Sequence, residues 1–138
     1  MIYRGSCHCR AIGFDYGTEL APESWSVRAC QCTFCRAHGA LSTSDPRGTL
    51  EFRVEAAGKL ERYRFARRTA DFLLCRGCGV YIGAVLAAPA GRFGIINLNT
   101  LADRLSVPTA QPANYDAEDE TARIARRVSR WTPIVAGL

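Results

Sequence analysis

The sequence lacks any apolar run long enough to span a membrane, and its N-terminal segment lacks the basic region and apolar stretch of a secretory or transit peptide. It also has no internal repeat, no low-complexity tract and no recognisable domain linker. A chain of 138 residues can bury one ordinary core but is too short for two. We therefore expect a single domain that works in the cytoplasm and has no membrane partner.

Seven cysteines are the most informative residues that the sequence does contain. In a reducing compartment they are more readily metal ligands or reactive thiols than disulfide partners, and an odd number would leave one unpaired. They fall into three clusters with none left over: Cys7 and Cys9, then Cys30, Cys32 and Cys35, then Cys75 and Cys78.

The last cluster, Cys75-Arg76-Gly77-Cys78-Gly79, has the form of a zinc knuckle, in which a tight turn directs backbone amides at the sulfurs. A redox pair is the alternative, but the βαβ context of thioredoxin-like motifs is missing. Thiolates also suit Cu(I) and iron–sulfur clusters, and ligand type alone leaves these open. Paired knuckles in a small domain favour tetrahedral zinc.

Spacing leaves two ways of sharing the sulfurs between metal ions. In one, Cys32 and Cys35 join the late pair in a ribbon-like site, which leaves the other three sulfurs unexplained. In the other, the early and late pairs form a closed four-thiolate structural site. The three middle cysteines then form a second site with one open position, as in catalytic zinc centres. The second arrangement uses every cysteine.

The basic residues give little support for nucleic-acid binding. The formal charge is +5, but only Lys59 is a lysine, and the arginines are scattered from Arg4 to Arg130. If the seven cysteines are thiolates on two zinc ions, seven negative charges against four positive ones remove much of this excess. We expect no nucleic-acid partner.

Two-residue alternation of apolar side chains predicts a mainly β domain of short antiparallel sheets. The strand signals cover residues 12–16, 25–29, 50–54, 63–65, 72–74, 80–86 and 93–98. Ala56–Lys59 is predicted to be the turn of a hairpin between the third and fourth of these segments. Residues 116–130 suggest a C-terminal helix, because Asp116 could cap it and arginines fill its last turn. Residues 108–112 are predicted to be an extended connection.

Five segments between residues 3 and 101 carry a resemblance to a known family: Gly5-Ser6-Cys7-His8-Cys9, Cys30-Gln31-Cys32-Thr33-Phe34-Cys35-Arg36, Gly58 through Tyr63-Arg64-Phe65, Phe72-Leu73-Leu74-Cys75-Arg76-Gly77-Cys78-Gly79 and Ile96-Asn97-Leu98. They resemble the glutathione-dependent formaldehyde-activating (GFA) family, and all seven cysteines follow that family's pattern in order. Ala37 and His38 stand where a basic residue and a small or hydroxyl residue are common, so we expect a different pocket wall.

The resemblance implies a tent-like β fold shared with a zinc-containing Rab-binding protein. Residues 1–110 would form the zinc-stabilised GFA domain, and residues 111–138 a C-terminal extension of the same domain that holds the helix. It also implies two zinc ions, a structural one on Cys7, Cys9, Cys75 and Cys78 and a catalytic one on Cys30, Cys32 and Cys35. The implied activity is that of a carbon–sulfur lyase, which forms or cleaves S-(hydroxymethyl)glutathione.

Two further side chains, His38 and Arg36, are predicted to act on the substrate. His38, three residues after Cys35, is predicted to donate a proton to the nascent alkoxide or to act as a fourth ligand. Arg36 is predicted to bind a carboxylate of glutathione or a similar small thiol, and balancing thiolate charge is its other possible role. A non-catalytic zinc-stabilised module that binds a small thiol or a protein is the alternative function, since metal ligands specify a site and not a substrate.

Overall fold

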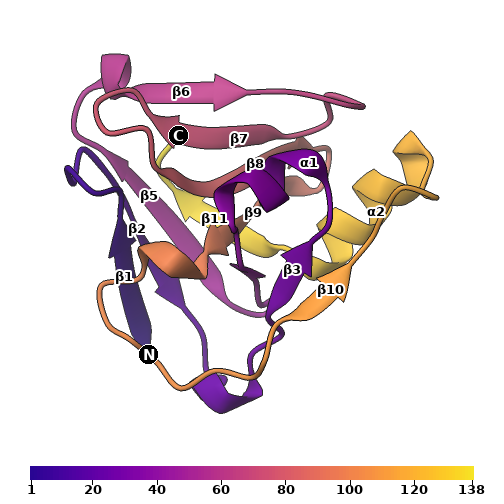
Figure 1. Cartoon of the computed structure of the whole chain (residues 1–138), viewed down its shortest axis with the longest axis horizontal. Coiled ribbons are helices and arrows are strands. Elements are labelled where there is room, and N and C mark those ends of the chain that lie inside the picture. The colour runs from indigo at the N-terminus through magenta and orange to yellow at the C-terminus, as the bar shows by residue number, and fades with distance from the viewer.

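The computed structural model describes all 138 residues as a mainly β domain with two α-helices (Figure 1). Its eleven strands are β1 (Ile2–Ser6), β2 (Ile12–Gly17), β3 (Arg28–Cys30), β4 (Ser42–Thr43), β5 (Thr49–Val54), β6 (Leu60–Tyr63), β7 (Asp71–Cys75), β8 (Tyr81–Ala88), β9 (Gly91–Asn97), β10 (Gln111–Ala113) and β11 (Thr132–Ala136). The helices are α1 (Thr33–His38) and α2 (Glu120–Arg130). Neither helix has the length and hydrophobicity that crossing a membrane requires. The predicted mainly β fold with a C-terminal helix is confirmed.

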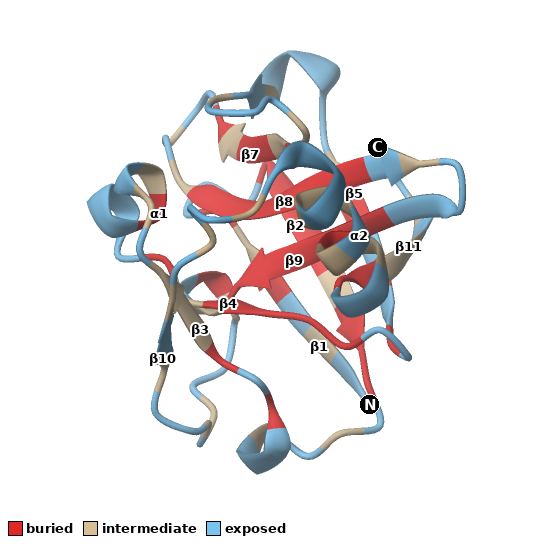
Figure 2. Cartoon of the chain, turned by 90° about the vertical axis from the view of Figure 1, so that its right-hand side faces the viewer, coloured by how far each residue is buried: buried red, intermediate tan, exposed pale blue.

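The sheet branches at β9. One edge of β9 pairs with β8, and the sheet continues from there through β7 to β6. The other edge is shared, because Gly94 faces Thr132 of β11 and Asn97 faces Ser42 of β4. From β11 the sheet runs through β5 and β2 to β1, and from β4 through β3 to β10. Three arms therefore meet at β9, which Figure 2 shows largely buried in the middle of the molecule.

Two of the strand pairings are parallel, so the sheet is mixed and not purely antiparallel as predicted. β10 pairs with β3, and β11 pairs with β5. Both of these partners come from residues 111–138. The C-terminal segment thus returns to the sheet twice, once beside the strand that carries Cys30 and once between β5 and β9.

The predicted hairpin around Ala56–Lys59 is wrong. β5 already has β2 on one edge and β11 on the other, so no edge is free for β6. β6 pairs with β7 instead, and residues 57–59 form a 3-10 turn. The strand predicted at residues 25–29 is also shifted, because Trp25 and Val27 are buried outside any strand and pairing starts at Arg28.

The core consists of two clusters of buried side chains. The larger one centres on β2 and β5, where Ile12, Phe14 and Leu50 are fully buried. The smaller one, which we call the site cluster, joins helix α1 to β7, β8, β9 and the residue after α2. Its largest members are Phe72, Tyr81, Phe93 and Trp131, and Cys35 belongs to it. Burying an aromatic side chain of this size contributes about 1.5–3 kcal/mol, so the site cluster holds Cys35 firmly relative to α2.

Helix α2 begins later than predicted, at Glu120. Asp119 is its N-cap, because one carboxylate oxygen of Asp119 accepts a hydrogen bond from the Ala122 amide at 2.7 Å. Asp116, the predicted cap, lies in the preceding turn. The helix contacts the site cluster through Ile124, and its outer side is exposed (Figure 2).

Candidate functional site

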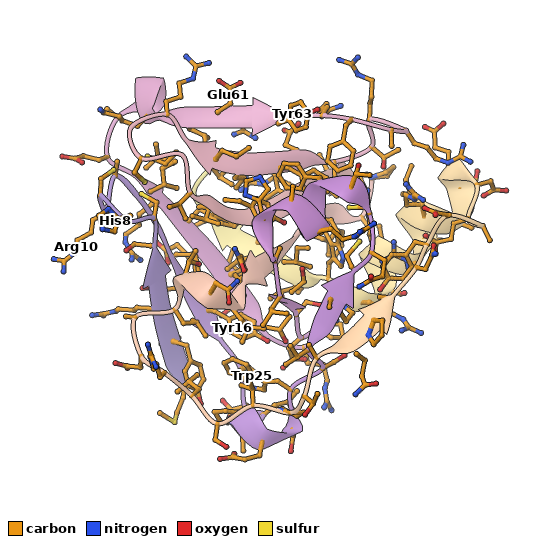
Figure 3. All side chains as sticks on the ribbon, viewed as in Figure 1. His8, Arg10, Tyr16, Trp25, Glu61 and Tyr63 are labelled. Carbon is orange, nitrogen blue, oxygen red and sulfur yellow. The ribbon has the colours of Figure 1, made fainter.

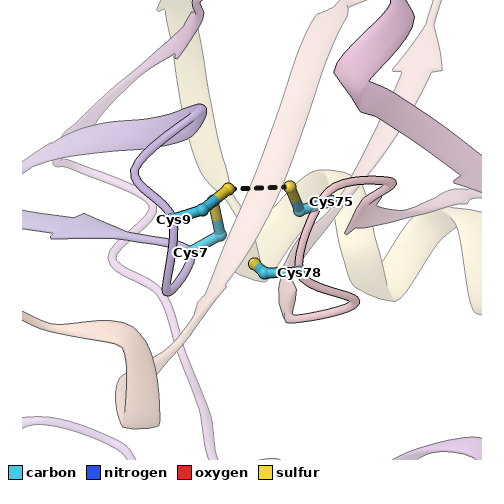
Figure 4. A group of neighbouring side chains, drawn as sticks. All are labelled: Cys7, Cys9, Cys75 and Cys78. Atoms are coloured by element: carbon cyan, nitrogen blue, oxygen red, sulfur yellow. Dashed lines mark hydrogen bonds between the residues drawn. The ribbon is translucent and has the colours of Figure 1, made fainter.

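Four cysteines from two distant segments meet in space (Figure 4). Cys7 and Cys9 follow β1, Cys75 ends β7 and Cys78 lies in the turn after it. All four Sγ atoms lie within 4.8 Å of one another, with Cys7 and Cys9 3.8 Å apart and Cys9 and Cys75 3.5 Å apart. A tetrahedral zinc ion with Zn–S bonds of about 2.3 Å separates its sulfurs by about 3.8 Å. This four-cysteine group therefore has the spacing of a closed thiolate metal site.

Backbone amides point at these sulfurs, as the knuckle form predicts. The Ile12 amide donates to Cys7 Sγ at 3.4 Å, and the Gly77 amide donates to Cys75 Sγ at 3.3 Å. Such donors stabilise the thiolate form that a metal requires. His8 is exposed, and Figure 3 shows it at the edge of the molecule, so it does not join the ligand group.

The other three cysteines form a second group at the start of α1. Cys30 ends β3, Cys32 is the N-cap of α1 and Cys35 lies in its first turn. Their Sγ atoms lie within 4.8 Å of one another, and the Cys35 amide donates to Cys32 Sγ at 3.4 Å. Gly39 ends the short helix in the left-handed conformation, with φ of 58°. The structure thus groups the sulfurs in the arrangement that uses every cysteine.

The thiols of this three-cysteine group differ in acidity. A hydrogen bond from Cys35 lowers the pKa of Cys30 to about 5, even though burial opposes ionisation. The pKa of Cys35 is raised, first by that same hydrogen bond and then by burial, and burial raises the pKa of Cys32. The hydrogen bond between Cys35 and Cys30 therefore favours an ionised sulfur within the group.

No fourth cysteine, histidine or carboxylate joins the three-cysteine group. His38 and Arg36 lie on α1 but are exposed, and the ring of His38 packs against Phe34 with centroids 4.5 Å apart. Neither side chain lines the cavity beside the sulfurs. Their predicted roles stay predictions.

A cavity of about 120 Å³ opens beside Cys30, Cys32 and Cys35. Aromatic side chains form part of its wall: Phe65, Phe72 and Trp131. Pockets that enclose drug-sized ligands are larger, about 300–1,000 Å³. The space therefore suits a small ligand or one end of a longer one, held next to the three sulfurs.

Five arginines also line this cavity: Arg28, Arg67, Arg123, Arg126 and Arg127. Arg126 donates two hydrogen bonds to Glu118, at 2.8 and 3.1 Å, and its guanidinium carbon lies 3.5 Å from the centroid of the Tyr115 ring. The hydrogen bonds from Arg126 lower the pKa of Glu118. The cavity is thus bounded by sulfur on one part of its wall and by positive charge on another.

Sequence reasoning missed the three α2 arginines as site residues. Their positions, 123, 126 and 127, follow the i, i+3 and i+4 spacing that puts side chains on one helix face. That spacing was the available signal for a basic face. It could not reveal that this face meets the segment that carries Cys30.

Comparisons with known proteins identify the family of the chain. The family model described as "glutathione-dependent formaldehyde-activating enzyme" matches residues 2–116, so α2 and β11 lie beyond the matched segment. A crystal structure of a Rhodobacter sphaeroides protein is similar, with 28% sequence identity and a TM-score of 0.55, over 76% of this chain and 97% of that chain. No curated protein matches the sequence. Because the matched segment spans most of the chain and holds all seven cysteines, the protein belongs to the glutathione-dependent formaldehyde-activating family.

Proposed function

We propose that this chain is a zinc-dependent carbon–sulfur lyase that forms or cleaves an S-(hydroxymethyl)glutathione-like adduct. One observation carries the proposal. Cys30, Cys32 and Cys35 come together without a fourth protein ligand, and a cavity opens beside them. Three protein ligands and an open position are typical of catalytic zinc, whereas four are typical of structural zinc. The family's name supports the same chemistry.

The cysteines would divide two zinc ions between them. The four-cysteine group (Cys7, Cys9, Cys75 and Cys78) would hold a structural ion, since its sulfur spacing and amide donors fit a closed tetrahedron. The three-cysteine group would hold the catalytic one. Zinc bound there would lower the pKa of a substrate thiol and supply positive charge close to the aldehyde oxygen.

In the synthetic direction, the sulfur of the thiol forms a bond to the aldehyde carbon. The electron pair of the carbonyl bond moves to oxygen, and the proton of the thiol ends on that oxygen; cleavage reverses each step. Within the chain, Phe65, Phe72 and Trp131 would exclude bulk water from the sulfur, and the site cluster would hold Cys35 in place.

We propose His38 as the proton donor and Arg36 as a contact for a substrate carboxylate. We also propose the cytoplasm as the location, because cysteines that bind metal stay reduced in that compartment.

Two cysteine substitutions test whether the three-cysteine group is catalytic and the four-cysteine group structural. Cys32→Ser removes one sulfur of the three-cysteine group, but serine is a good N-cap, so α1 should still form. We expect a folded protein that retains one zinc ion and no longer accelerates exchange between formaldehyde and its glutathione adduct. Cys75→Ser should instead unfold the chain, because structural zinc contributes roughly 10 kcal/mol or more to folding.

The measurements are zinc stoichiometry, circular dichroism and adduct exchange followed by NMR. If these residues act as proposed, His38→Ala should slow adduct exchange. Arg36→Ala should raise the glutathione concentration that the exchange needs, because glutathione would bind more weakly. Full exchange activity in folded Cys32→Ser would overturn the lyase proposal. A wild-type protein that binds thiols but never accelerates exchange would point to the alternative, a non-catalytic binding module.

A further inference from the structure

We propose that the arginines of α2 form a carboxylate-binding subsite, so that the substrate of the three-cysteine site is a small thiol that carries a carboxylate. Arg127 is its central residue, and Arg123 and Arg28 assist. The identity of the reaction rests on the proposed function, but the binding preference can be measured without turnover. The subsite lies in the cavity that the three cysteines share with α2.

Arg127 is a buried cation without an acidic partner. Its side chain is only 8% exposed, and no carboxylate lies within ion-pair distance of it, since every ion pair in the structure involves other arginines. One terminal nitrogen donates to Thr69 Oγ1 at 2.7 Å, and the guanidinium carbon lies 4.9 Å from the centroid of the Trp131 ring. Its Nε has no hydrogen-bond partner. A buried guanidinium left in this state is costly unless an anion completes its contacts.

The residues around Arg127 add positive charge and do not neutralise it. Arg123 donates one hydrogen bond, to the Tyr115 carbonyl at 2.8 Å, and its buried Nε lies 3.6 Å from Glu118 without making a hydrogen bond. Glu118 is shared between Arg123 and Arg126, so one carboxylate serves two guanidinium groups. Arg28, which lines the same cavity, donates only to the hydroxyl of Ser44. Of the acidic residues, only the exposed Asp116 lines the cavity.

Charge balance for the sulfurs does not account for these arginines. Three thiolates on one divalent zinc ion carry a net charge of −1, which a single guanidinium offsets. The cavity wall still has Arg28, Arg67 and Arg127 without any carboxylate, in addition to the pair that shares Glu118. A carboxylate accepts two parallel hydrogen bonds from a guanidinium, which fits the unpartnered donors.

The size and position of the cavity narrow the substrate class. A space of about 120 Å³ between sulfur and arginine has room for a short thiol carboxylate, or for one carboxyl-bearing end of glutathione. A short thiol carboxylate and glutathione present the same chemistry, a carboxylate and a thiol in one molecule. Arg127 and Arg123 lie beyond residues 2–116, the segment matched by the family model, so the family match does not cover the central residue of the subsite; Arg28 lies within the matched segment.

The test uses the zinc-loaded full chain and matched thiols. Mercaptoacetate and 2-mercaptoethanol are similar in size but only the first carries a carboxylate, and calorimetry gives the dissociation constant of each. We expect mercaptoacetate to bind about ten-fold more tightly or better, because hydrogen bonds to charged groups are worth that much, and this preference should shrink as salt is raised. Glutathione and its glycine monoethyl ester form a second pair, which tells whether the tripeptide also uses the subsite.

Arg127→Gln is the decisive variant and Arg130→Gln its matched control. Arg130 lies on the same helix but is exposed and does not line the cavity. We expect R127Q to lose most of the preference for mercaptoacetate while its affinity for 2-mercaptoethanol stays constant, and R130Q to retain the wild-type ratio. Circular dichroism and zinc stoichiometry verify that each variant is folded and loaded. If R127Q does not fold, R123Q provides the same comparison.

Three outcomes would overturn the inference. Equal binding of the two thiols by the wild type is one, and an unchanged ratio in both R127Q and R123Q is another. A parallel loss of zinc and of both thiols in these variants is the third, because it would mean that the arginines only balance the thiolates. A different outcome would contradict the lyase proposal alone. Carboxylate-selective binding without any adduct exchange would refute the activity and would still support the subsite.

Discussion

Gly79 shows how one residue allows the late cysteine pair to form its turn. Its φ angle is +80°, and its amide donates to the Cys75 carbonyl at 2.7 Å, which closes the turn that carries Cys78. A side chain at this position would meet no atom within 4 Å, so space is not the constraint. The constraint is the left-handed backbone, which only glycine adopts without strain.

Gly79→Ala should therefore destabilise the zinc-loaded protein by about 1–2 kcal/mol through backbone strain alone. Urea unfolding monitored by circular dichroism measures the difference. Gly58→Ala is the matched control, because a Cβ there also meets nothing within 4 Å and its φ is not in the left-handed region. Equal stability of the two variants would contradict this account of the turn.

The ionisation of Glu118 makes the stability of the protein depend on pH. Hydrogen bonds from Arg126 lower its pKa below the ordinary value of 4.5. A carboxyl group whose pKa is lowered in the folded state adds stability that is present above the unfolded pKa and is lost as the pH falls through the folded pKa. Protonation of Glu118 would also leave Arg123 and Arg126 without their shared counter-ion.

When the pH is lowered from neutral to below about 4.5, the free energy of unfolding should thus fall more in the wild type than in Glu118→Gln. The glutamine side chain has no charge that protonation could remove. Urea midpoints collected across this range for both proteins give the comparison. Glu23→Gln, at an exposed glutamate without an ion pair, should follow the wild-type curve. Parallel curves for the wild type and E118Q would show that the pairing does not contribute.

At the scale of elements, α2 is a helix that the sequence predicted with the wrong start. Asp116 and Asp119 are both residue types that cap helices, and the local sequence favours neither strongly. The structure places Asp119 at the cap, which shortens the helix and leaves Asp116 among the residues that line the cavity.

Asp119→Ala should destabilise the protein by about 1 kcal/mol, the usual value of a lost N-cap, since the Ala122 amide would lose its acceptor. Asp116→Ala, the substitution at the residue that the sequence suggested as cap, should change stability by less than about 0.5 kcal/mol. Thermal or urea unfolding of both variants decides between the two caps. A larger loss in D116A than in D119A would move the start of the helix.

Other elements differ in how far the sequence could predict them. β2, β5, β8 and β9 have regular apolar alternation or apolar runs, and their existence follows from local pattern. Helix α1 has six residues, too few to show a helical period, and was not predicted. β11 was missed because it contains Pro133, which normally argues against a strand inside a sheet. β1 is an edge strand with mostly accessible residues, so its pattern is weak.

At the scale of the whole molecule, the C-terminal segment is built into the sheet. β11 lies between β5 and β9, β10 pairs with β3, and Trp131 is buried in the site cluster. Figure 1 shows this segment, in orange and yellow, running past β3 and then behind α1 into the sheet. We propose that residues 111–138 are an obligatory part of the same folding unit as residues 1–110.

A chain that ends at residue 110 should accordingly fail to fold cooperatively even with zinc, because β5 and β9 would lose a partner and the site cluster would lose Trp131. Near-UV circular dichroism and urea unfolding provide the readout. A second chain that ends at residue 131 keeps β10, α2 and Trp131 but lacks β11, and separates the contribution of the last strand. A sharp unfolding transition in the chain of residues 1–110 would show that the extension is a separate addition.

The sequence by itself determined the chemistry of this protein: seven cysteines in three clusters, the knuckle turn with its glycine, and enough alternation for a mainly β domain. Those features are local, since each depends on residues close together in the chain. Only the tertiary structure decided between the two ways of sharing the sulfurs, placed β11 at the edge of β5, and brought the arginines of α2 to the cavity beside Cys30. These arrangements join residues that are far apart in sequence, and their proximity depends on the packing of the whole domain and not on any local preference.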